Sequence, residues 1–439
     1  MSDAVVLGLP IEQRNARLAS LDESLRSSLW VIPAFFLFIV VVVAETAVAL
    51  DSGTGADVTF WMLTIADDVS SATVVLTTIA TSMLTLLAVV FPLTIVALQL
   101  ASSQFSPRVM RRFVRDWITQ ATFGSFVATF VYALLVLRTI EPATVDTPAF
   151  VPDVAVSITI IWVWLSLGWF VVFVHHIVQS IRVVNIIEAV AKETREAIEQ
   201  NAPLNVSYLD VERPELGEPD QVITFDEAAG TLDGMETDRL VRAATEADVV
   251  LVLRCRVGDY LPTGLPVIEV HGGRCTNTAH LLSAFEIGPE RTMYQDVGFG
   301  FRQLVDIAAK ALSPAVNDPT TATQVLDRIE DLLHDLGRRP MSPSIYLDQA
   351  GDVRMLRPRA TWDDYVLLSF TEIRRFGADS AQVCRRLSAV LTSLEQALPD
   401  ERCAPLEAQR TLLRRSVERH FLDAEDRAVG LTPDRQGLG

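Results

Sequence analysis

"FFLFIVVVVA", from Phe35 to Ala44, is an unbroken apolar run inside a longer apolar segment that extends from Leu29 to Leu50. The hydrocarbon core of a bilayer is about 30 Å thick, and a helix needs roughly 20 apolar residues to cross it. The segment is long enough, and it follows a charged stretch, residues 1–28, which does not fit a cleaved signal peptide. We therefore expect a first membrane-spanning helix here, preceded by an N-terminal segment over 1–28.

Three further segments have the same character and account for the other long apolar runs. They are Ala72 to Leu100, Thr119 to Leu137 and Val154 to Val174. The first of these is unusually long, because a helix from Val69 to Leu100 would reach about 48 Å at 1.5 Å per residue. It must tilt, kink at Pro92 or extend beyond the bilayer. The sequence thus predicts an α-helical membrane domain of four transmembrane helices over residues 29–183.

The charges of the connecting segments predict the orientation of this domain. Basic residues gather before the first span, between the second and third spans, and after the fourth. The other two connections carry acidic residues and a single basic residue, Arg138. Positively charged connections stay in the cytoplasm. We therefore expect a multi-pass membrane protein with both termini cytoplasmic.

Hydroxyl side chains recur along one face of the second and third spans. They are Thr73, Thr77, Thr81 and Thr85 on the second, and Thr122, Ser125 and Thr129 on the third. Two interpretations are open: such faces serve close helix packing and interhelical hydrogen bonds, or they line a path for an ion or solute. The spans carry no charged residue clearly at the midplane, which argues against a proton-relay pump.

Two further groups lie at the expected cytoplasmic side of the membrane. His175 and His176 end the fourth span, where they could gate or sense pH, or only reach the interface as amphipathic side chains do. The segment 103–116 has the pattern of an interfacial amphipathic helix. Its four arginines would contact anionic lipid, or only fix the topology: Arg108, Arg111, Arg112 and Arg115.

The rest of the chain predicts a cytosolic α+β domain with a small β module and a helical C-terminal part. A helix and linker cover 184–219. Alternating apolar residues between Asp248 and Val270 are typical of strands, and we expect a small β-barrel or β-sandwich over 220–273. Amphipathic helices indicate a helical domain over 274–428, which includes a short hairpin from Ser344 to Leu356, and 429–439 reads as a disordered tail.

The segment "ALSPAVNDPTTA", Ala311 to Ala322, interrupts the helical pattern. Pro314 ends one helix, and Asp318 with Pro319 is suited to begin the next. The local pattern is therefore helix, tight corner, helix. The alternative is a ligand site beside a free helix N-terminus, which favours anions. The candidate ligand residues are Ser313, Asn317, Asp318 and Thr320.

Three motifs resemble a bacterial family of predicted inner-membrane proteins of unknown function. They are "QLASSQFSPRVMRRFVRD" from Gln99, "FVHHIVQSIRV" from Phe173 and "QDVGFGFRQLVDIAAKALSPAVNDPTTA" from Gln295, which holds the signature ALSPAxNDPxTA. The resemblance spans roughly Leu29 to Val390. It implies several membrane helices followed by a cytosolic domain, and it implies no reaction, substrate or catalytic residue.

The sequence contains no pattern typical of an enzyme. It lacks a phosphate loop, a complete dinucleotide fingerprint, and zinc-protease or serine-hydrolase motifs. Its four cysteines form no C-x-x-C pair, so no metal or cofactor site is predicted. A net charge of −18 disfavours nucleic acid as a partner.

We expect contact with membrane lipid, a homo-oligomer and an unidentified ligand. Two functions fit: an oligomeric ion channel or transporter with a cytosolic regulatory domain, or a non-conducting membrane-anchored sensor or scaffold whose cytosolic domain binds a ligand or protein.

Overall fold

The computed structural model describes residues 2–6, 31–54, 68–104, 117–143, 149–180, 182–204, 209–341 and 344–435. The chain divides into two compact units. The membrane unit comprises Gln13–Arg182, and the extramembrane unit comprises Met1–Glu12 together with Val183–Gly439.

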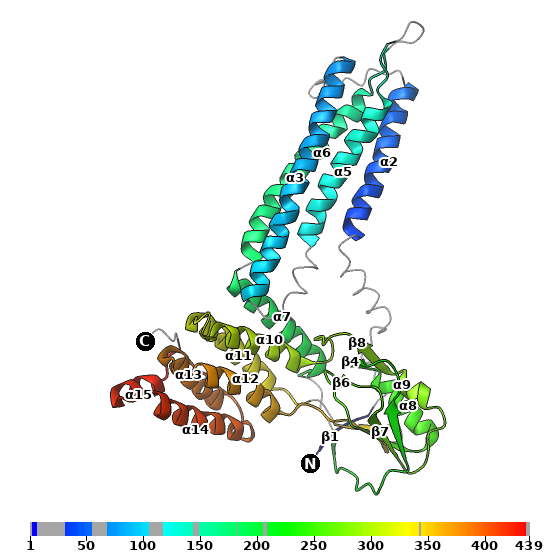
Figure 1. Cartoon of the computed structure of the whole chain (residues 1–439). Coiled ribbons are helices and arrows are strands. Elements are labelled where there is room, and N and C mark those ends of the chain that lie inside the picture. Colours follow the sequence, from blue (N-terminus) through cyan, green and yellow to red (C-terminus); the bar gives the residue numbers. More distant parts are fainter. Residues whose placement is uncertain are drawn as a thin grey trace. The chain divides into compact units, whose positions relative to one another are not determined.

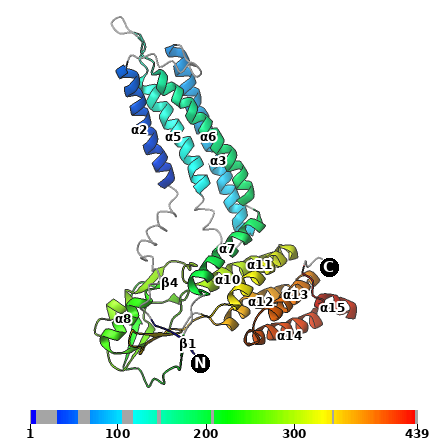
Figure 2. The same cartoon turned by 180° about the vertical axis from the view of Figure 1, so that it is seen from behind.

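The membrane unit contains four long helices that run side by side (Figure 1, Figure 2). They are α2 (Val31–Thr54), α3 (Val69–Gln104), α5 (Trp117–Thr139) and α6 (Asp153–Ser180). Each is long and apolar enough to cross a membrane, which confirms the four predicted spans. Pro92 lies inside α3. Helix α5 packs against the other three and is the most buried of the four.

Small residues and polar contacts hold this bundle together. A Cβ at Gly124 of α5 would lie 3.1 Å from the ring of Phe36, so this glycine allows α2 to approach closely. The carboxylate of Asp51 accepts hydrogen bonds from the backbone N–H groups of Val154 (3.2 Å) and Ala155 (3.1 Å). An acceptor at that position caps the N-terminus of α6. The sequence analysis did not predict this link between α2 and α6.

The extramembrane unit contains two sheets. The strands are β1 (Ser2–Val6), β2 (Leu209–Val211), β3 (Gln221–Phe225), β4 (Gly230–Met235), β5 (Val250–Leu253), β6 (Tyr260–Leu261), β7 (Leu265–His271), β8 (Phe285–Gly288), β9 (Ile345–Leu347) and β10 (Val353–Leu356). The seven-stranded sheet has the order β2-β1-β9-β10-β5-β7-β3, and the three-stranded sheet has the order β6-β4-β8. Strand β1 is parallel to β9 and antiparallel to β2, so the start of the chain lies in the same sheet as residues that follow the four spans.

This arrangement corrects the expectation of a barrel or sandwich within residues 220–273. Five strands from outside that range, β1, β2, β8, β9 and β10, complete the two sheets. Local alternation of apolar residues identifies a strand but not its distant partner, and the parallel pairs β1–β9 and β5–β10 join segments far apart in sequence. The predicted hairpin between Ser344 and Leu356 is confirmed as β9 and β10, which pair antiparallel.

Two short helices, α8 (Thr237–Ala247) and α9 (Thr278–Leu282), accompany the strands. The remaining helices lie together at the other side of the unit (Figure 1). They are α7 (Val183–Asn201), α10 (Val297–Ala311), α11 (Pro319–Gly337), α12 (Trp362–Phe376), α13 (Ala381–Ala397), α14 (Cys403–His420) and α15 (Ala424–Leu431). The expected disordered tail is wrong for residues 429–435, because α15 continues to Leu431, Gly430 is buried, and Asp434 pairs with Arg385 at 3.1 Å.

Helix α7 begins three residues after the last residue of α6 and packs against α10 and α11. The contact with α10 is very close at Gly300, where a Cβ would come within 2.1 Å of the hydroxyl oxygen of Thr194. Thr194 is fully buried and donates its hydroxyl hydrogen bond back to Val190. The glycine in the middle of α10, unfavourable for an isolated helix, is therefore explained by this crossing.

Candidate functional site

The hydroxyl face predicted on the third span lies inside the bundle. Thr122, Ser125 and Thr129 are fully buried on α5. The hydroxyl groups of Thr129 and Ser166 of α6 are 2.7 Å apart, and Ser166 also donates to the backbone oxygen of Ser125 at 3.3 Å. Within one chain these residues form an interface between α5 and α6. The hydroxyl of Tyr132, also on α5, is buried and has no hydrogen-bond partner among the described residues.

The hydroxyl face predicted on the second span points away from the bundle. Thr73 is half-buried, and Thr77, Thr81 and Thr85 are exposed. The hydroxyls of Thr73, Thr81 and Thr85 donate to backbone oxygens one turn earlier in α3. Such bonds satisfy a threonine without any partner helix. The two hydroxyl faces look alike in sequence, but the face on α5 is buried inside the bundle and most of the face on α3 is exposed.

The other membrane candidates have local partners or lie outside the described residues. His176 Nε2 is 3.0 Å from the hydroxyl of Ser180, and His175 is exposed. Glu45 of α2 and Arg138 of α5 pair at 3.8 Å at the surface of the unit. The interfacial helix 103–116 falls outside the described part of the chain, apart from its first two residues, and so do its arginines: Arg108, Arg111, Arg112 and Arg115.

The corner between α10 and α11 has the predicted geometry. Asp318 caps α11 by accepting from the backbone N–H of Thr321 (3.1 Å) and from its hydroxyl (2.5 Å). Ser313 donates to the backbone of Lys310, and Asn317 has a φ of +48°, which asparagine tolerates. Thr320 is exposed. Each polar residue but Thr320 thus has a role in the turn, and none of the four candidate residues lines the cavity described next.

The extramembrane unit has a polar cavity of about 240 Å³ between its strand-rich and helical parts. We call it the arginine cavity. Its walls come from the end of α7, the turn between β5 and β6, the start of α10, the segment after β10 and the start of α12. Its charged lining residues are Arg256, Arg291, Arg357, Arg359, Asp259, Asp296 and Asp364.

One wall of the cavity holds two arginines without a carboxylate partner among the described residues. Arg357 is 3% exposed, and it donates from Nη1 to the hydroxyl of Thr237 at 3.2 Å. Arg359 donates from Nη2 to the phenol oxygen of Tyr346 at 2.6 Å. The Nε atoms of both arginines are buried and have no hydrogen-bond partner in the described structure. Burial, and then repulsion by Arg359, lowers the pKa of Arg357 to about 10.

The phenol of Tyr346 is the polar group nearest to this pair. Its side chain is buried, which alone would raise its pKa, but the charges of Arg359 and Arg357 outweigh burial and lower the pKa below the ordinary value. Tyr346 therefore accepts a hydrogen bond from Arg359, and the two arginines favour its ionised form.

The opposite wall is internally paired. Arg291 donates to Asp296 Oδ2 from Nε (2.9 Å) and Nη2 (2.6 Å), and Asp296 also caps α10 at the N–H of Phe299. Burial raises the pKa of Asp296 despite this arginine. Gly258, with a φ of +95°, lies so close that a Cβ would come within 2.4 Å of Asp296 Oδ2. The second arginine of this wall, Arg256, reaches Asp364 at 3.5 Å.

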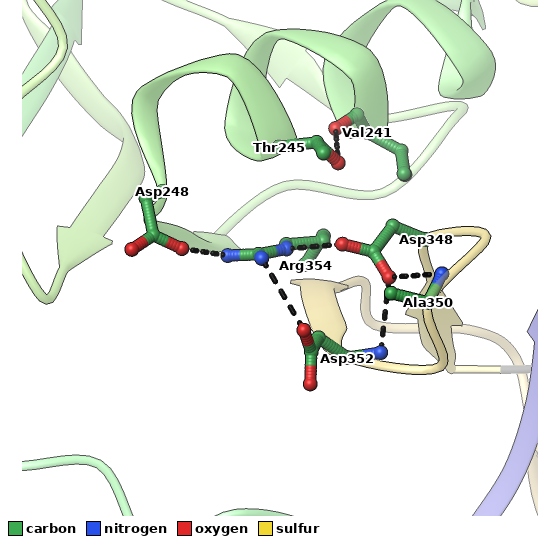
Figure 3. Close-up of polar contacts among 7 residues, drawn as sticks. All are labelled: Val241, Thr245, Asp248, Asp348, Ala350, Asp352 and Arg354. Atoms are coloured by element: carbon green, nitrogen blue, oxygen red, sulfur yellow. Dashed lines mark hydrogen bonds and ion pairs between the residues drawn. The ribbon is translucent and has the colours of Figure 1, made fainter.

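A charge network in the β9–β10 hairpin fixes the segment that carries the unpaired arginines (Figure 3). Arg354 contacts three carboxylates: Asp348 (2.7 Å), Asp248 (2.8 Å) and Asp352 (3.5 Å). Asp348 also accepts from the backbone N–H groups of Ala350 and Asp352. Arg357 follows directly after β10, so the network anchors the wall of the cavity to the sheet.

Sequence reasoning missed this cavity. It did not single out "RPRA", Arg357 to Ala360. The available signal was two arginines in a short segment between a strand and a capped helix. The lack of a nearby carboxylate depends on the three-dimensional fold, so the spacing of residues in the sequence could not predict it.

The comparisons with known proteins agree with the four spans. The family model described as "Predicted membrane protein (DUF2254)" matches residues 26–393. Uncharacterized protein Rv1290c of Mycobacterium tuberculosis and uncharacterized protein Mb1321c of Mycobacterium bovis are each 32% identical to the chain over 435 residues, which cover 95% of this chain and 81% of each relative. No solved structure matches the chain. The chain therefore belongs to the DUF2254 family of predicted membrane proteins.

Proposed function

We propose that this protein is a membrane-anchored sensor of the bacterial inner membrane, whose cytoplasmic extramembrane unit binds a small ligand in the arginine cavity. The observation that carries the proposal is the cavity itself, a polar space at a junction within the unit, where the buried Arg357 and the half-buried Arg359 have no carboxylate partner among the described residues. Ligand sites occur preferentially at such junctions. We propose no enzymatic reaction and no nucleic-acid partner.

The topology supports a single side for the whole extramembrane unit. Strand β1 precedes the four spans and pairs with β2 and β9, which follow them. Four crossings return the chain to its starting side, and the basic connections favour the cytoplasm. A reporter fused after Gly439 is expected to be active only in its cytoplasmic form, and activity of a periplasmic reporter would contradict this orientation.

Helix α7 supports a link between the cavity and the membrane helices. It starts at Val183, three residues after Ser180 at the end of α6, and its last residue, Asn201, lines the cavity. Between these ends it packs on α10 through the crossing of Thr194 and Gly300. A ligand that orders the start of α10 therefore acts on the helix that continues from the fourth span.

The test is a binding screen on the full-length protein in maltoside micelles, read as a shift in unfolding temperature. The panel contains small anions, cations and neutral solutes. Ala360→Phe places a bulky ring in the cavity wall, and Ala243→Phe, on the half-buried surface of α8, is the matched control. At least one compound is expected to stabilise the wild type and the control but not Ala360→Phe. Equal responses of all three proteins to every compound would contradict a ligand in this cavity.

A second function, an oligomeric channel or transporter, is favoured by one observation. The exposed face of Thr77, Thr81 and Thr85 would require a second copy of the chain to form a polar path, and hydroxyl faces occur at such interfaces. If the protein is a sensor and not a channel, liposomes that contain it are expected to show no flux of K⁺, Na⁺ or Cl⁻. Flux that is lost in Thr81→Leu but retained in Thr129→Val would favour the channel.

A further inference from the structure

Resting on the proposed function, we infer that the arginine cavity binds a phosphate-bearing small molecule, with Arg357 and Arg359 as the charged partners of the phosphate. The inference starts from the charge balance of the lining. Four arginines and three aspartates line the cavity, and the carboxylates of Asp296 and Asp364 are already paired with Arg291 and Arg256.

The remaining carboxylate does not neutralise the two arginines. Asp259 accepts a hydrogen bond from the backbone N–H of Arg256 at 2.8 Å and makes no ion pair among the described residues. Two guanidinium groups therefore share one wall, and one of them is almost fully buried. Buried charges in proteins are paired, and an unpaired one is costly. An anionic ligand would supply the missing partner.

Other buried arginines of the same unit show that this state is unusual. Arg386, 5% exposed, contacts both Asp327 and Glu330. Arg374, 7% exposed, has no carboxylate, but its Nε and Nη1 donate to Gln409 and Ser416. Arg386 and Arg374 therefore use their Nε donors, whereas the Nε atoms of Arg357, Arg359 and Arg385 have no partner in the described structure. Of these three arginines, Arg385 has a carboxylate partner, Asp434, and the other two have none among the described residues.

Charge and volume select the class of ligand. A phosphate monoester carries about −1.5 to −2 at neutral pH, which matches two guanidinium groups better than a single carboxylate does. The planar guanidinium also binds phosphate oxygens with two parallel hydrogen bonds. The cavity of about 240 Å³ lies just below the roughly 300–1,000 Å³ of pockets for drug-sized ligands, so the molecule is a small phosphate ester.

The start of α10 does not take the phosphate. A free helix N-terminus attracts anions, but Asp296 already caps this one, and its carboxylate would repel a second negative charge. The phosphate therefore lies on the side of Arg357 and Arg359, and the paired wall faces the rest of the ligand.

The experiment measures binding by calorimetry to the full-length protein in maltoside micelles, which contain no phosphate, at constant ionic strength. The probes are inorganic phosphate, glycerol 3-phosphate, the short-chain lipid dihexanoyl phosphatidate, and succinate as a carboxylate control. The variants are Arg359→Gln and Arg359→Lys, with Arg242→Gln, an exposed arginine of α8, as the matched control. Ala360→Phe blocks the cavity without removing an arginine, should loss of Arg359 impair folding.

Glycerol 3-phosphate is expected to bind the wild type and Arg242→Gln equally. Loss of one charge-assisted contact in Arg359→Gln should weaken binding by about 10- to 100-fold, and Arg359→Lys should retain part of the affinity. Binding of dihexanoyl phosphatidate without binding of the soluble phosphates would assign the phosphate to a lipid headgroup.

Two results would overturn the inference. In one, succinate binds as tightly as glycerol 3-phosphate. In the other, phosphate binding is absent, or is unchanged in both Arg359→Gln and Ala360→Phe. If a neutral or cationic compound instead binds and is blocked by Ala360→Phe, the phosphate assignment fails while the proposed sensor function stands.

Discussion

Strand β10 and the segment that leaves it hold arginines in different surroundings. Arg354 lies among three aspartates (Figure 3), whereas Arg357 and Arg359, a few residues later, have no carboxylate partner in the described structure. The side chains of Arg354 and Arg357 are both largely buried. The counter-charges of Arg354 tie it to the fold, whereas Arg357 and Arg359 are the residues that we propose to bind a ligand.

The largest expected effect comes from exchanging these two arginines for an apolar residue of similar length. Arg354→Met should lower the free energy of unfolding by about 2 kcal/mol, less than for a fully buried pair, because Asp248 and Asp352 are exposed. Arg357→Met removes an unpaired buried charge and should change it by less than about 1 kcal/mol, or increase it. Calorimetric unfolding of both variants tests this, and equal destabilisation would remove the contrast.

A comparable effect is expected from the paired wall of the cavity. Gly258→Ala should destabilise by about 1–3 kcal/mol, because the new Cβ meets Asp296 and Arg291 and the backbone has a positive φ. Gly264, with a φ of +86° and open space around it, is the matched control. Gly264→Ala should show only the backbone cost in the same calorimetric measurement, and a loss as large as that of Gly258→Ala would deny the close packing of this wall.

The pH dependence of stability separates the two arginines further. The hydrogen bond from Arg354 holds the pKa of Asp348 below its ordinary value, although burial opposes this. A carboxyl with a lowered folded-state pKa stabilises the protein above its unfolded pKa of about 3.9 and loses that contribution as pH falls through the folded value. The stability gap between wild type and Arg354→Met, from denaturant titrations at pH 3 to 6, should therefore close toward acid. A gap that is constant or widens toward pH 3 would contradict the network.

The smallest effect concerns the membrane unit. There, a hydroxyl bonded to another helix can be compared with one bonded only to its own helix. A double-mutant cycle of Thr129→Val and Ser166→Ala should give a coupling of about 0.6 kcal/mol, within the range measured for membrane hydrogen bonds. Thr81→Ala, which removes a hydroxyl bonded only to its own helix, should change stability by less. Steric-trap or denaturant measurements in micelles test both, and zero coupling between Thr129 and Ser166 would contradict their hydrogen bond.

Much of the fold could be predicted from the sequence because bilayer thickness acts on continuous apolar runs. The four spans, the hairpin before Arg357 and the corner capped by Asp318 follow from local rules of length, turn residues and capping. The sheet could not be predicted, because the paired strands β1 and β9 lie more than 300 residues apart in the sequence and no local pattern identifies them as partners. The same limit applied to the hydroxyl faces: Thr81 and Thr129 each belong to a face with helical spacing, yet only the neighbouring helices decide which of the two is buried.

The candidate site was less predictable than the fold. Arg357 and Arg359 looked like ordinary charged residues, because the signal is the absence of a counter-charge in space. The corner at Ser313 and Asn317 attracted attention through its composition, and the structure gives those residues roles in the turn. The unusual composition of the corner therefore indicated the geometry of a turn, whereas arginines that did not stand out in the sequence line the cavity.

The most direct test of the account is amide hydrogen exchange of the full-length protein in maltoside micelles, with and without glycerol 3-phosphate, for wild type and Arg359→Gln. The account predicts slower exchange with ligand at the cavity, residues 256–259 and 291–299, and along α7 from 190 to 201, in the wild type alone. Unchanged exchange in α7 of a protein that binds the ligand, or the same protection in Arg359→Gln, would contradict a phosphate-responsive cavity linked to the membrane helices.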